Sequence, residues 1–303
     1  MNGILIIDKP AGITSHDVVS RVRRVLKTKR VGHTGTLDPF ATGVMVILVG
    51  QATRLAQFLD KDEKEYEALV RFGFETDTGD RTGVRRGDAG TQGRGDELTL
   101  DKVAAVLPEF TGEIKQTPPM YSAKKIDGKK LYEHARKGEV VERKAVTVNI
   151  FSLELSENSA CMDLELGTWN LELRVACSAG TYIRTLAEDI GRKVGVGAHL
   201  AELRRTRAGK FAIQQSITLE HLGELDDPHL ALIRMETAVC NLPKLELTDD
   251  RIDKTRNGLP TRIIDQTFNK GEAVRMQDAA GNLIAIGFYD AEENIVQPKV
   301  VLV

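Results

Sequence analysis

The chain has 303 residues, of which 41% are hydrophobic and 28% charged, and its formal net charge is −2. This is the composition of an ordinary globular protein, long enough for one large core or for a core with a small second domain. Its three cysteines are far apart and no His or Cys pair has metal-ligand spacing, which excludes a disulfide framework and a zinc site. No leader or membrane-spanning stretch is present, so we expect a cytoplasmic protein without cofactor or metal.

The first elements follow from turn and capping signals. Residues 3–8 predict a strand, which ends at the turn 9–12. Residues 14–17 (Thr-Ser-His-Asp) have the form of a capping box, and apolar residues at helical spacing follow at 18, 22, 25 and 26. The next expected elements are a loop, a strand, a short helix and a strand, over residues 31–43, 44–49, 53–59 and 66–72.

The middle of the chain mixes helices and strands. Six glycines among Asp, Thr and Arg predict an exposed loop over residues 75–97. After it we expect a helix (101–110), a polar basic stretch (115–144), three strands (145–155, 161–166 and 170–177), a helix (181–194), a strand (210–214) and a helix (219–225). From about Leu245 onwards, short strands and Gly/Asn turns predict a small β-rich domain. Without regular βαβ alternation, the pattern favours an α+β fold.

The loop from Gly32 to Gly43 holds the most informative polar residues. It places the Asp38 carboxylate, the His33 imidazole and three hydroxyls between glycines that let the backbone bend tightly. Because Pro39 follows, the backbone of Asp38 is restricted to extended geometry, which fixes the direction of its side chain. Composition alone favours an Asx-type turn, and a phosphate cradle is excluded because no G-K-[ST] follows the glycines.

The order of motifs along residues 3–210 closely resembles that of the bacterial tRNA pseudouridine-55 synthase family, the TruB family. The matching segments are residues 8–19, 32–39, 76–80, 118–123, 128–132, 180–185, 197–200 and 203–205. This resemblance implies an isomerase (an intramolecular transferase, EC 5.4.99.25) that converts uridine 55 in the T-loop of tRNA to pseudouridine. It implies base flipping, no cofactor, and assistance to tRNA folding.

The same resemblance implies the domain organisation. A catalytic domain with the pseudouridine synthase fold is expected over residues 1–235, with a central, mainly antiparallel mixed sheet, flanking helices and an RNA-gripping insertion near 115–145. A small PUA-like RNA-binding domain is expected over residues 245–303. Residues 246–303 carry ten acidic and seven basic side chains, so the contribution of that domain to RNA binding stays open.

The resemblance also assigns the site residues. Asp38 is the expected catalytic aspartate, and Arg184 resembles the arginine that pairs with it when no substrate is bound. Tyr66 resembles the tyrosine that stacks on the flipped base, Tyr182 a second aromatic residue of the pocket, and Leu203 an apolar residue that lines it. These roles fit the chemistry, since a carboxylate can stabilise or capture the positive charge that develops when a glycosidic bond breaks. Aromatic rings can return part of the cost of unstacking the base.

Two further residues complete the expected substrate-binding set. His33 resembles the histidine that enters the T-loop and fills the space left by the displaced nucleotide, and Lys9 belongs to the first matching segment. Without the resemblance, His33 would be a solvated loop residue.

Two clusters of basic residues provide the RNA signal that the net charge hides. Residues 21–30 hold six Lys or Arg and no acidic residue, and residues 115–144 hold nine basic against four acidic residues. Such clusters bind phosphates without selecting a sequence, although a single run is more often a solvated face. The expected RNA-backbone contacts are Arg21, Arg24, Lys124, Lys125, Lys129, Lys130, Arg204 and Arg205.

The expected partner is the T-arm of tRNA, bound by a monomer without an obligatory protein partner and away from membranes. One alternative is a synthase that depends on a guide RNA, from which activity on naked tRNA would distinguish it. The other is an RNA-binding or RNA-folding protein without catalysis, which would have no use for the carboxylate of Asp38.

Overall fold

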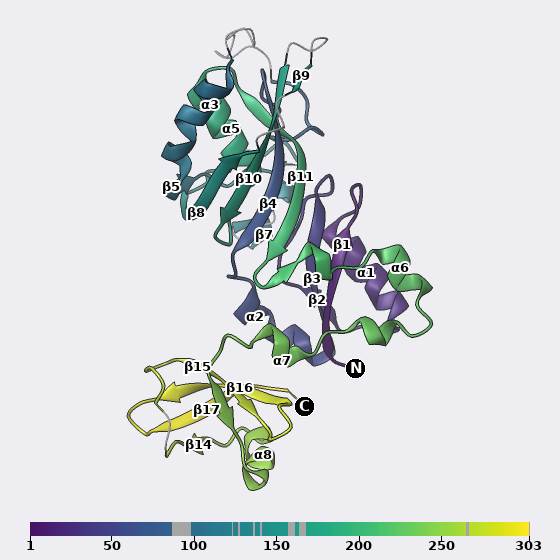
Figure 1. The fold of residues 1–303 in the computed structure, drawn as a ribbon, viewed down its shortest axis with the longest axis vertical. Helices are drawn as coiled ribbons and strands as arrows, with labels where there is room; N and C mark the ends of the chain where they lie inside the picture. The colour runs from purple at the N-terminus through teal and green to yellow at the C-terminus, as the bar shows by residue number, and fades with distance from the viewer. Residues whose placement is uncertain are drawn as a thin grey trace.

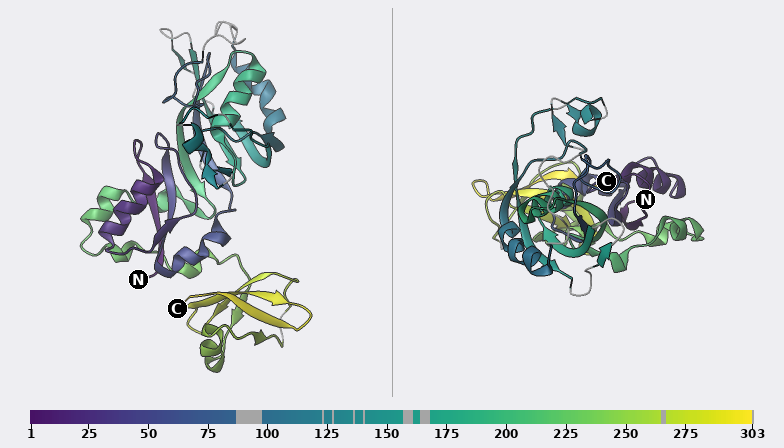
Figure 2. Two further views of the ribbon diagram at one scale, coloured as in Figure 1. Left: turned by 180° about the vertical axis from the view of Figure 1, so that it is seen from behind. Right: turned by 90° about the horizontal axis from the view of Figure 1, so that it is seen from above.

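The computed structural model describes residues 1–86, 98–122, 124–126, 128–135, 137–139, 141–156, 161–163, 168–264 and 267–302. A large sheet with flanking helices and a smaller β-rich unit make up the molecule (Figures 1 and 2). The loop expected over 75–97 and the strand expected over 161–166 fall partly outside the described residues. Within those residues, no helix has the length and apolar character needed to cross a membrane.

The N-terminal strands form one part of the large sheet. Strand β1 (Gly3–Lys9) pairs antiparallel with β3 (Thr42–Val49), and β2 (Val31–His33) pairs with the other edge of β3. Strand β2 begins inside the segment that the sequence suggested to be a loop. Because β3 is buried along nearly its whole length, both faces of this part of the sheet are covered.

Helix α1 (Ser15–Val25) covers one of these faces and confirms the capping-box prediction. The Thr14 hydroxyl accepts a hydrogen bond from the Asp17 backbone N–H at 3.1 Å, and the Asp17 carboxylate accepts one from the Thr14 N–H at 2.8 Å. The helix buries Val18 and Val22 in the core that it shares with β1 and β3.

Four antiparallel strands extend the sheet beyond a long strand β11 (Ala198–Ala208). The order is β1-β3-β11-β4-β10-β8-β5, in which only β3 and β11 run parallel. The expected α+β fold with a central, mainly antiparallel mixed sheet is therefore confirmed. The remaining strands of this part are β4 (Lys64–Phe72), β5 (Gly112–Gln116), β8 (Val146–Leu155), β9 (Cys161–Asp163), β10 (Thr168–Cys177) and β12 (Phe211–Ala212).

Helices α3 (Leu100–Val106) and α5 (Ile183–Val194) lie on one face of these strands (Figure 1). The shorter elements connect or flank the strands. They are the 3-10 helices η1 (Gly50–Leu55), η3 (Leu107–Phe110), η4 (Ile213–Gln215) and η5 (Pro228–Ala231), the helices α2 (Ala56–Leu59), α4 (Leu131–Ala135), α6 (Leu219–Glu224) and α7 (Met235–Ala238), and the short hairpin β6 (Lys125–Ile126) and β7 (Lys129–Lys130).

Strand β11 departs from the sequence expectation, which assigned no element to residues 198–208. Its register against β4 shifts between Leu200 and Glu202 and again between Arg205 and Arg207, so the alternation of buried and exposed residues is interrupted twice. The strand expected at 210–214 was placed too broadly, because only Phe211 and Ala212 pair with β11 before a 3-10 turn begins.

The parallel contact between β3 and β11 depends on a glycine. Gly43 has a φ of +101°, and a Cβ atom at this position would lie 2.2 Å from the carbonyl oxygen of Arg205. Only two residue pairs, Thr42 with Arg204 and Gly43 with Arg205, form this contact. The close backbone approach at Gly43 therefore joins the two parts of the sheet.

The C-terminal unit is a five-stranded sheet with its own small core, in the order β13-β15-β16-β17-β14. Its elements are β13 (Lys244–Glu246), α8 (Asp249–Arg256), β14 (Thr261–Arg262), β15 (Ala273–Gln277), β16 (Leu283–Asp290) and β17 (Ile295–Val301). Leu283, Ile286 and Val300 share a second buried cluster with Ile4 and Leu48, so this unit packs on the N-terminal strands. A β-rich C-terminal region is confirmed, whereas its PUA-like character and the domain boundaries stay predictions.

We predict that Gly43→Ala strongly destabilises the protein. Both the left-handed backbone and the clash with Arg205 oppose a side chain there, so a loss of at least about 3 kcal/mol in the free energy of unfolding is expected. Gly258→Ala is the matched control, because Gly258 has a φ of +80° but open space around its Cβ position, and about 1–2 kcal/mol is expected. Urea unfolding measures both. Equal losses would show that the β3–β11 approach is not the critical constraint.

Candidate active site

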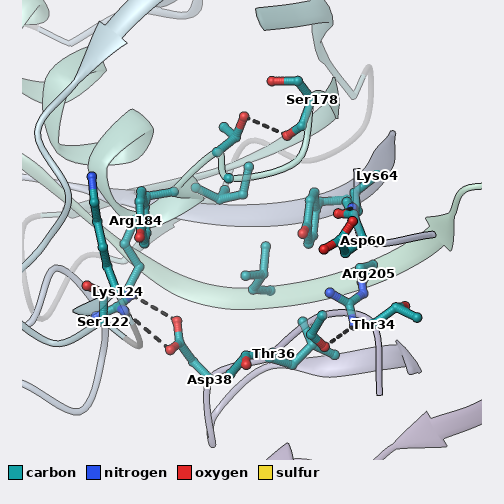
Figure 3. Close-up of a pocket in the computed structure, with 18 residues that line it drawn as sticks. Thr34, Thr36, Asp38, Asp60, Lys64, Ser122, Lys124, Ser178, Arg184 and Arg205 are labelled. Atoms are coloured by element: carbon teal, nitrogen blue, oxygen red, sulfur yellow. Dashed lines mark hydrogen bonds and ion pairs between the residues drawn. The ribbon is translucent and has the colours of Figure 1, made fainter. Parts of the chain in front are cut away.

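A cleft of about 250 Å³ opens between the loop after β2, strands β4 and β11, and the start of α5. It brings together residues from distant parts of the chain, and Figure 3 shows Asp38 and Arg184 near one end and Arg205 near the other. The residues expected in a site that do line this cleft are Asp38, Tyr66, Lys124, Tyr182, Arg184, Leu203 and Arg205.

The centre of the cleft is an ion pair between Asp38 and Arg184. The Nε atom of Arg184 lies 2.9 Å from Oδ2 of Asp38, and its Nη2 donates to Oδ1 at 3.2 Å. Such a bidentate contact fixes the orientation of both groups. The arginine side chain is 6% exposed and the aspartate side chain 31% exposed, so the carboxylate faces the open cleft while its partner is buried.

The other donors of Arg184 are also occupied. Nη1 donates to the carbonyl of Thr78 at 2.9 Å, and Nη2 donates to the carbonyl of Tyr121 at 2.6 Å. A second, buried carboxylate, that of Asp80, lies 3.6 Å from Nη1. Thr78, Asp80 and Tyr121 lie in segments that carry the family resemblance, but no sequence pattern indicates what they contact. Together these contacts fix the orientation in which the Arg184 guanidinium faces Asp38.

The surroundings act on the pKa of Asp38 in opposite directions. Burial raises the pKa of this carboxyl above its usual value, and the nearby charge of Asp80 raises it further. The charge of Arg184 and its hydrogen bond lower the pKa again, as does the charge of Lys9. The ion pair therefore offsets part of the burial penalty on the charged carboxylate.

Two side chains near the N-terminus anchor the backbone of the loop that carries Asp38. Ser15 exchanges hydrogen bonds with the backbone of Leu37, donating to its carbonyl at 3.0 Å and accepting from its N–H at 2.9 Å. Lys9 is fully buried, and its ammonium donates to the carbonyls of Pro39 at 3.2 Å and Ala41 at 2.6 Å. The backbone on both sides of Asp38 is thus anchored.

The position of Lys9 suits an anchor of the loop, and its expected contact with substrate stays a prediction. Its ammonium does not line the cleft and also donates to the Pro10 carbonyl at 2.9 Å. Burial lowers the pKa of Lys9 to about 8, although the charge of Asp38 opposes this. At neutral pH the ammonium is still mostly protonated, and its three donors match the three carbonyls.

Two tyrosines and a leucine line the cleft beside the ion pair. Tyr66 comes from β4, Leu203 from β11, and Tyr182 precedes the first turn of α5. Gln116 fixes the backbone of Tyr182, accepting from its N–H at 3.0 Å and donating to its carbonyl at 3.3 Å. Burial raises the pKa of both phenols, so both stay protonated at neutral pH.

The expected RNA-contacting residues fall into different environments. Arg24 and Lys129 are exposed, and Arg21 is exposed but lies 3.8 Å from Glu220. Lys124 is half-buried at the cleft. The side chains of Lys125 and Lys130 lie outside the described part of the structure.

Two arginines and a histidine differ from their expected settings. Arg204 is engaged by Asp8, with Nη2 2.7 Å from Oδ2. Arg205 is only 2% exposed, lines the cleft and donates to the Val44 carbonyl at 2.7 Å, and its expected contact with the RNA backbone stays a prediction. His33 is half-buried in β2, does not line the cleft, and has a pKa lowered by burial.

The chemistry of the cleft depends on one carboxylate. Its central group is a carboxylate in a partly apolar, aromatic setting, suited to nucleophilic attack, to general base action or to stabilisation of a cationic centre. Across the described residues, no group of three His, Cys, Asp or Glu side chains could hold a metal ion.

Comparisons with known proteins agree with this fold and show the family of the chain. Two family models match the chain: "TruB family pseudouridylate synthase (N terminal domain)" over residues 23–183 and "tRNA pseudouridylate synthase B C-terminal domain" over residues 184–233. The chain is 40% identical to the tRNA pseudouridine synthase B of Halalkalibacterium halodurans, covering 100% of this chain and 98% of that protein. It is 45% identical to the protein of the same name from Geobacter sulfurreducens, covering 90% and 87%.

Solved structures show the same likeness. A Cbf5–Nop10–Gar1 complex contains a chain with a TM-score of 0.74 and 30% identity, covering 99% of this chain and 85% of that one. An H/ACA RNP bound to a substrate RNA contains one with a TM-score of 0.74 and 27% identity. The fold and the cleft thus define a pseudouridine synthase. Within that class, the chain belongs to the TruB family of pseudouridylate synthases.

We predict that Lys9→Met loosens the loop that carries Asp38. Methionine preserves the apolar stem but leaves the carbonyls of Pro39 and Ala41 without a buried donor, which should cost about 2 kcal/mol of stability. Turnover should fall by more than this loss explains, because the loop positions the carboxylate. Chemical unfolding and kcat measure the two effects.

Lys299→Met in the C-terminal sheet is the matched control. Lys299 is exposed, so this change should alter stability by less than about 0.5 kcal/mol. Full stability and turnover in Lys9→Met would contradict the anchoring role of Lys9.

Proposed function

We propose that this chain converts uridine 55 in the T-loop of tRNA to pseudouridine, with Asp38 as its catalytic residue. Membership of the TruB family and the bacterial relatives named tRNA pseudouridine synthase B support this function. The single observation that carries the role of Asp38 is its contact with Arg184, 2.9 Å away, at the centre of a cleft lined by two tyrosines. The enzyme is accordingly an isomerase, and we propose that it acts without a cofactor.

The reaction rearranges bonds within one nucleotide. The bond between N1 of uracil and C1′ of ribose breaks, the freed uracil turns, and a bond forms between C5 and C1′. The hydrogen at C5 leaves as a proton, and N1 gains one, so atoms and electrons balance without an oxidant or reductant. An ionised Asp38 can attack the sugar, attack the base, or remove a proton from the sugar. All three routes need a charged carboxylate, which Arg184 favours.

The uridine must leave its stack to reach this carboxylate. Unstacking costs a few kcal/mol, and stacking on an aromatic ring can return ~1–3 kcal/mol per base. We propose that Tyr66 stacks on the flipped uracil, that Tyr182 and Leu203 border it, and that His33 enters the T-loop in its place. Both tyrosines, Leu203 and Asp38 line this one cleft, which supports these roles.

The proposed partner is tRNA, bound by a monomer that needs no protein or guide RNA and acts in the cytoplasm. The match to the relative from Halalkalibacterium halodurans, over 100% of this chain and 98% of that protein, supports an enzyme that works alone. The chains in the H/ACA RNP and in the Cbf5–Nop10–Gar1 complex are less similar, at 27% and 30% identity. We also propose that residues 1–235 form the catalytic domain and residues 245–303 a PUA-like domain, and that the enzyme assists tRNA folding.

We predict that Asp38→Asn abolishes turnover while the protein stays folded. Asparagine preserves the shape and can still hydrogen-bond in the loop, but a neutral amide is too poor a nucleophile or base for this reaction. Affinity for tRNA should change far less, because binding depends on phosphate contacts over a wide surface. Paired measurements of tRNA affinity and pseudouridine yield test this.

Asp226→Asn removes an exposed charge and should leave yield and affinity unchanged. Appreciable turnover by Asp38→Asn, after deamidation has been excluded by mass spectrometry, would rule out Asp38 as the catalytic residue. Loss of folding would favour a structural turn instead.

We predict that replacing Lys124, Lys125, Lys129 and Lys130 together by Ala weakens tRNA binding and reduces its salt dependence. Each phosphate contact that is lost should lower the log–log slope of affinity against salt by roughly 0.7–0.9. A salt titration of binding measures the slope. An unchanged slope would show that these four lysines are solvated and do not contact phosphates.

A further inference from the structure

A buried guanidinium lies at the end of the cleft away from the ion pair. Arg205 is 2% exposed, lines the same cleft as Asp38, and is drawn beside Thr34 in Figure 3, across the cleft from Arg184. No role in the reaction proposed above has been given to it. Since arginine is rarely buried without a carboxylate, its partners are informative.

These partners belong to three different elements. Nε donates to the Val44 carbonyl in β3 at 2.7 Å, and Nη2 donates to the Gly35 carbonyl at 3.2 Å, in the loop that leads to Asp38. Arg205 also lies opposite Tyr66 in the register of β11 against β4, and both residues line the cleft. One side chain therefore bonds to the loop of the catalytic carboxylate and neighbours the residue whose ring is proposed to stack on the uracil.

The backbone directs Arg205 to this place. In strand β11 it lies opposite Tyr66 on one side and opposite Gly43 on the other. The register of β11 shifts directly after Arg205, and such bulges redirect side chains next to active sites. The missing Cβ atom of Gly43 lets the Arg205 backbone approach β3, so the position is built by the sheet itself.

The chemistry of the group suits positioning more than stability. The two oxygens to which Arg205 donates are neutral carbonyls, and it forms no ion pair with a carboxylate in the described part of the chain, so burying its charge costs free energy. Its planar fork of donors can hold several acceptors at fixed mutual angles, which a flexible lysine cannot. A fold that needed only packing here would be at least as stable with an apolar side chain.

We propose that Arg205 is a positioning residue for the isomerisation: it fixes the separation of Tyr66 from the loop that carries Asp38, and so holds the flipped uracil at the carboxylate. This inference rests on the proposed function. It assigns Arg205 no contact with RNA phosphates. Displacing either partner by about 1 Å should be enough to lower the rate of the chemical step about 100-fold.

The first test compares Arg205→Lys, Tyr66→Phe and the double variant in single-turnover reactions with saturating tRNA. Arg205→Lys keeps the charge but loses the fork, and kcat should fall about 100-fold while the Kd for tRNA and its salt slope stay within twofold of wild type. Tyr66→Phe removes only the hydroxyl and should lower kcat about tenfold. If Arg205 acts partly through its neighbour Tyr66, the double variant should be no slower than Arg205→Lys alone.

A second variant covers the case in which Arg205→Lys does not fold. A Cβ atom at Gly35 would lie 3.3 Å from Nη1 of Arg205, so Gly35→Ala shifts the guanidinium by a few tenths of an ångström without removing it, at a backbone position without positive φ. Its kcat should fall at least fivefold at unchanged Kd. Gly223→Ala in α6 is the control, because nothing lies within 4 Å of that Cβ position, and it should match wild type.

Each outcome is decisive. Normal kcat in Gly35→Ala or in folded Arg205→Lys, or multiplicative effects in the double variant, would overturn the positioning role. So would a loss confined to Kd with a smaller salt slope, which would instead indicate a phosphate contact. Failure of the wild-type chain to form pseudouridine 55 would refute the proposed function. The variants are compared with wild type, so their results test the role of Arg205 separately.

Discussion

The ion pair between Asp38 and Arg184 is the interaction on which the rest of the structure depends. It joins side chains 146 residues apart in the sequence, and several polar contacts near the cleft support one of its two ends. On one side, Lys9 and Ser15 hold the loop around Asp38. On the other, backbone carbonyls and a second carboxylate hold the guanidinium. A carboxylate that is half-open to a cleft can stay charged there only because its partner is fixed.

The sheet explains how these ends meet. Its two parts are joined by the short parallel contact of β3 with β11, and the catalytic loop directly precedes β3. Tyr66 and Leu203, which line the cleft, come from β4 and β11 in the other part of the sheet. The cleft therefore lies across the contact between the two parts. Arg205 in β11 bonds to β3 and to the catalytic loop, and so controls distances across this contact. The uncommon parallel pair in an otherwise antiparallel sheet is a consequence of bringing a loop from one part to the strands of the other.

Local signals in the sequence predicted the elements that they govern. The capping box at Thr14 and the apolar spacing of Val18 and Val22 gave α1, and the family motifs gave the residues around the ion pair. The central strand β11 was missed because two bulges break its alternation and its charged residues hide its burial. The backbone acceptors of Lys9 and Arg205 were missed for a related reason: a basic side chain in a motif suggests a contact with a ligand, whereas only the tertiary structure shows that it donates to backbone carbonyls. The partners of Arg184 in the segment around Asp80 are non-local contacts of the same kind.

The most direct test of the account is tritium release from tRNA transcripts labelled at C5 of uridine, with the purified chain and no other macromolecule. Because C5 loses its hydrogen when it becomes the glycosidic carbon, each isomerisation releases one label. The account predicts release of one equivalent from a transcript with uridine at position 55, and none from the same transcript with cytidine there. Absence of release from naked tRNA, or equal release from both transcripts, would contradict it.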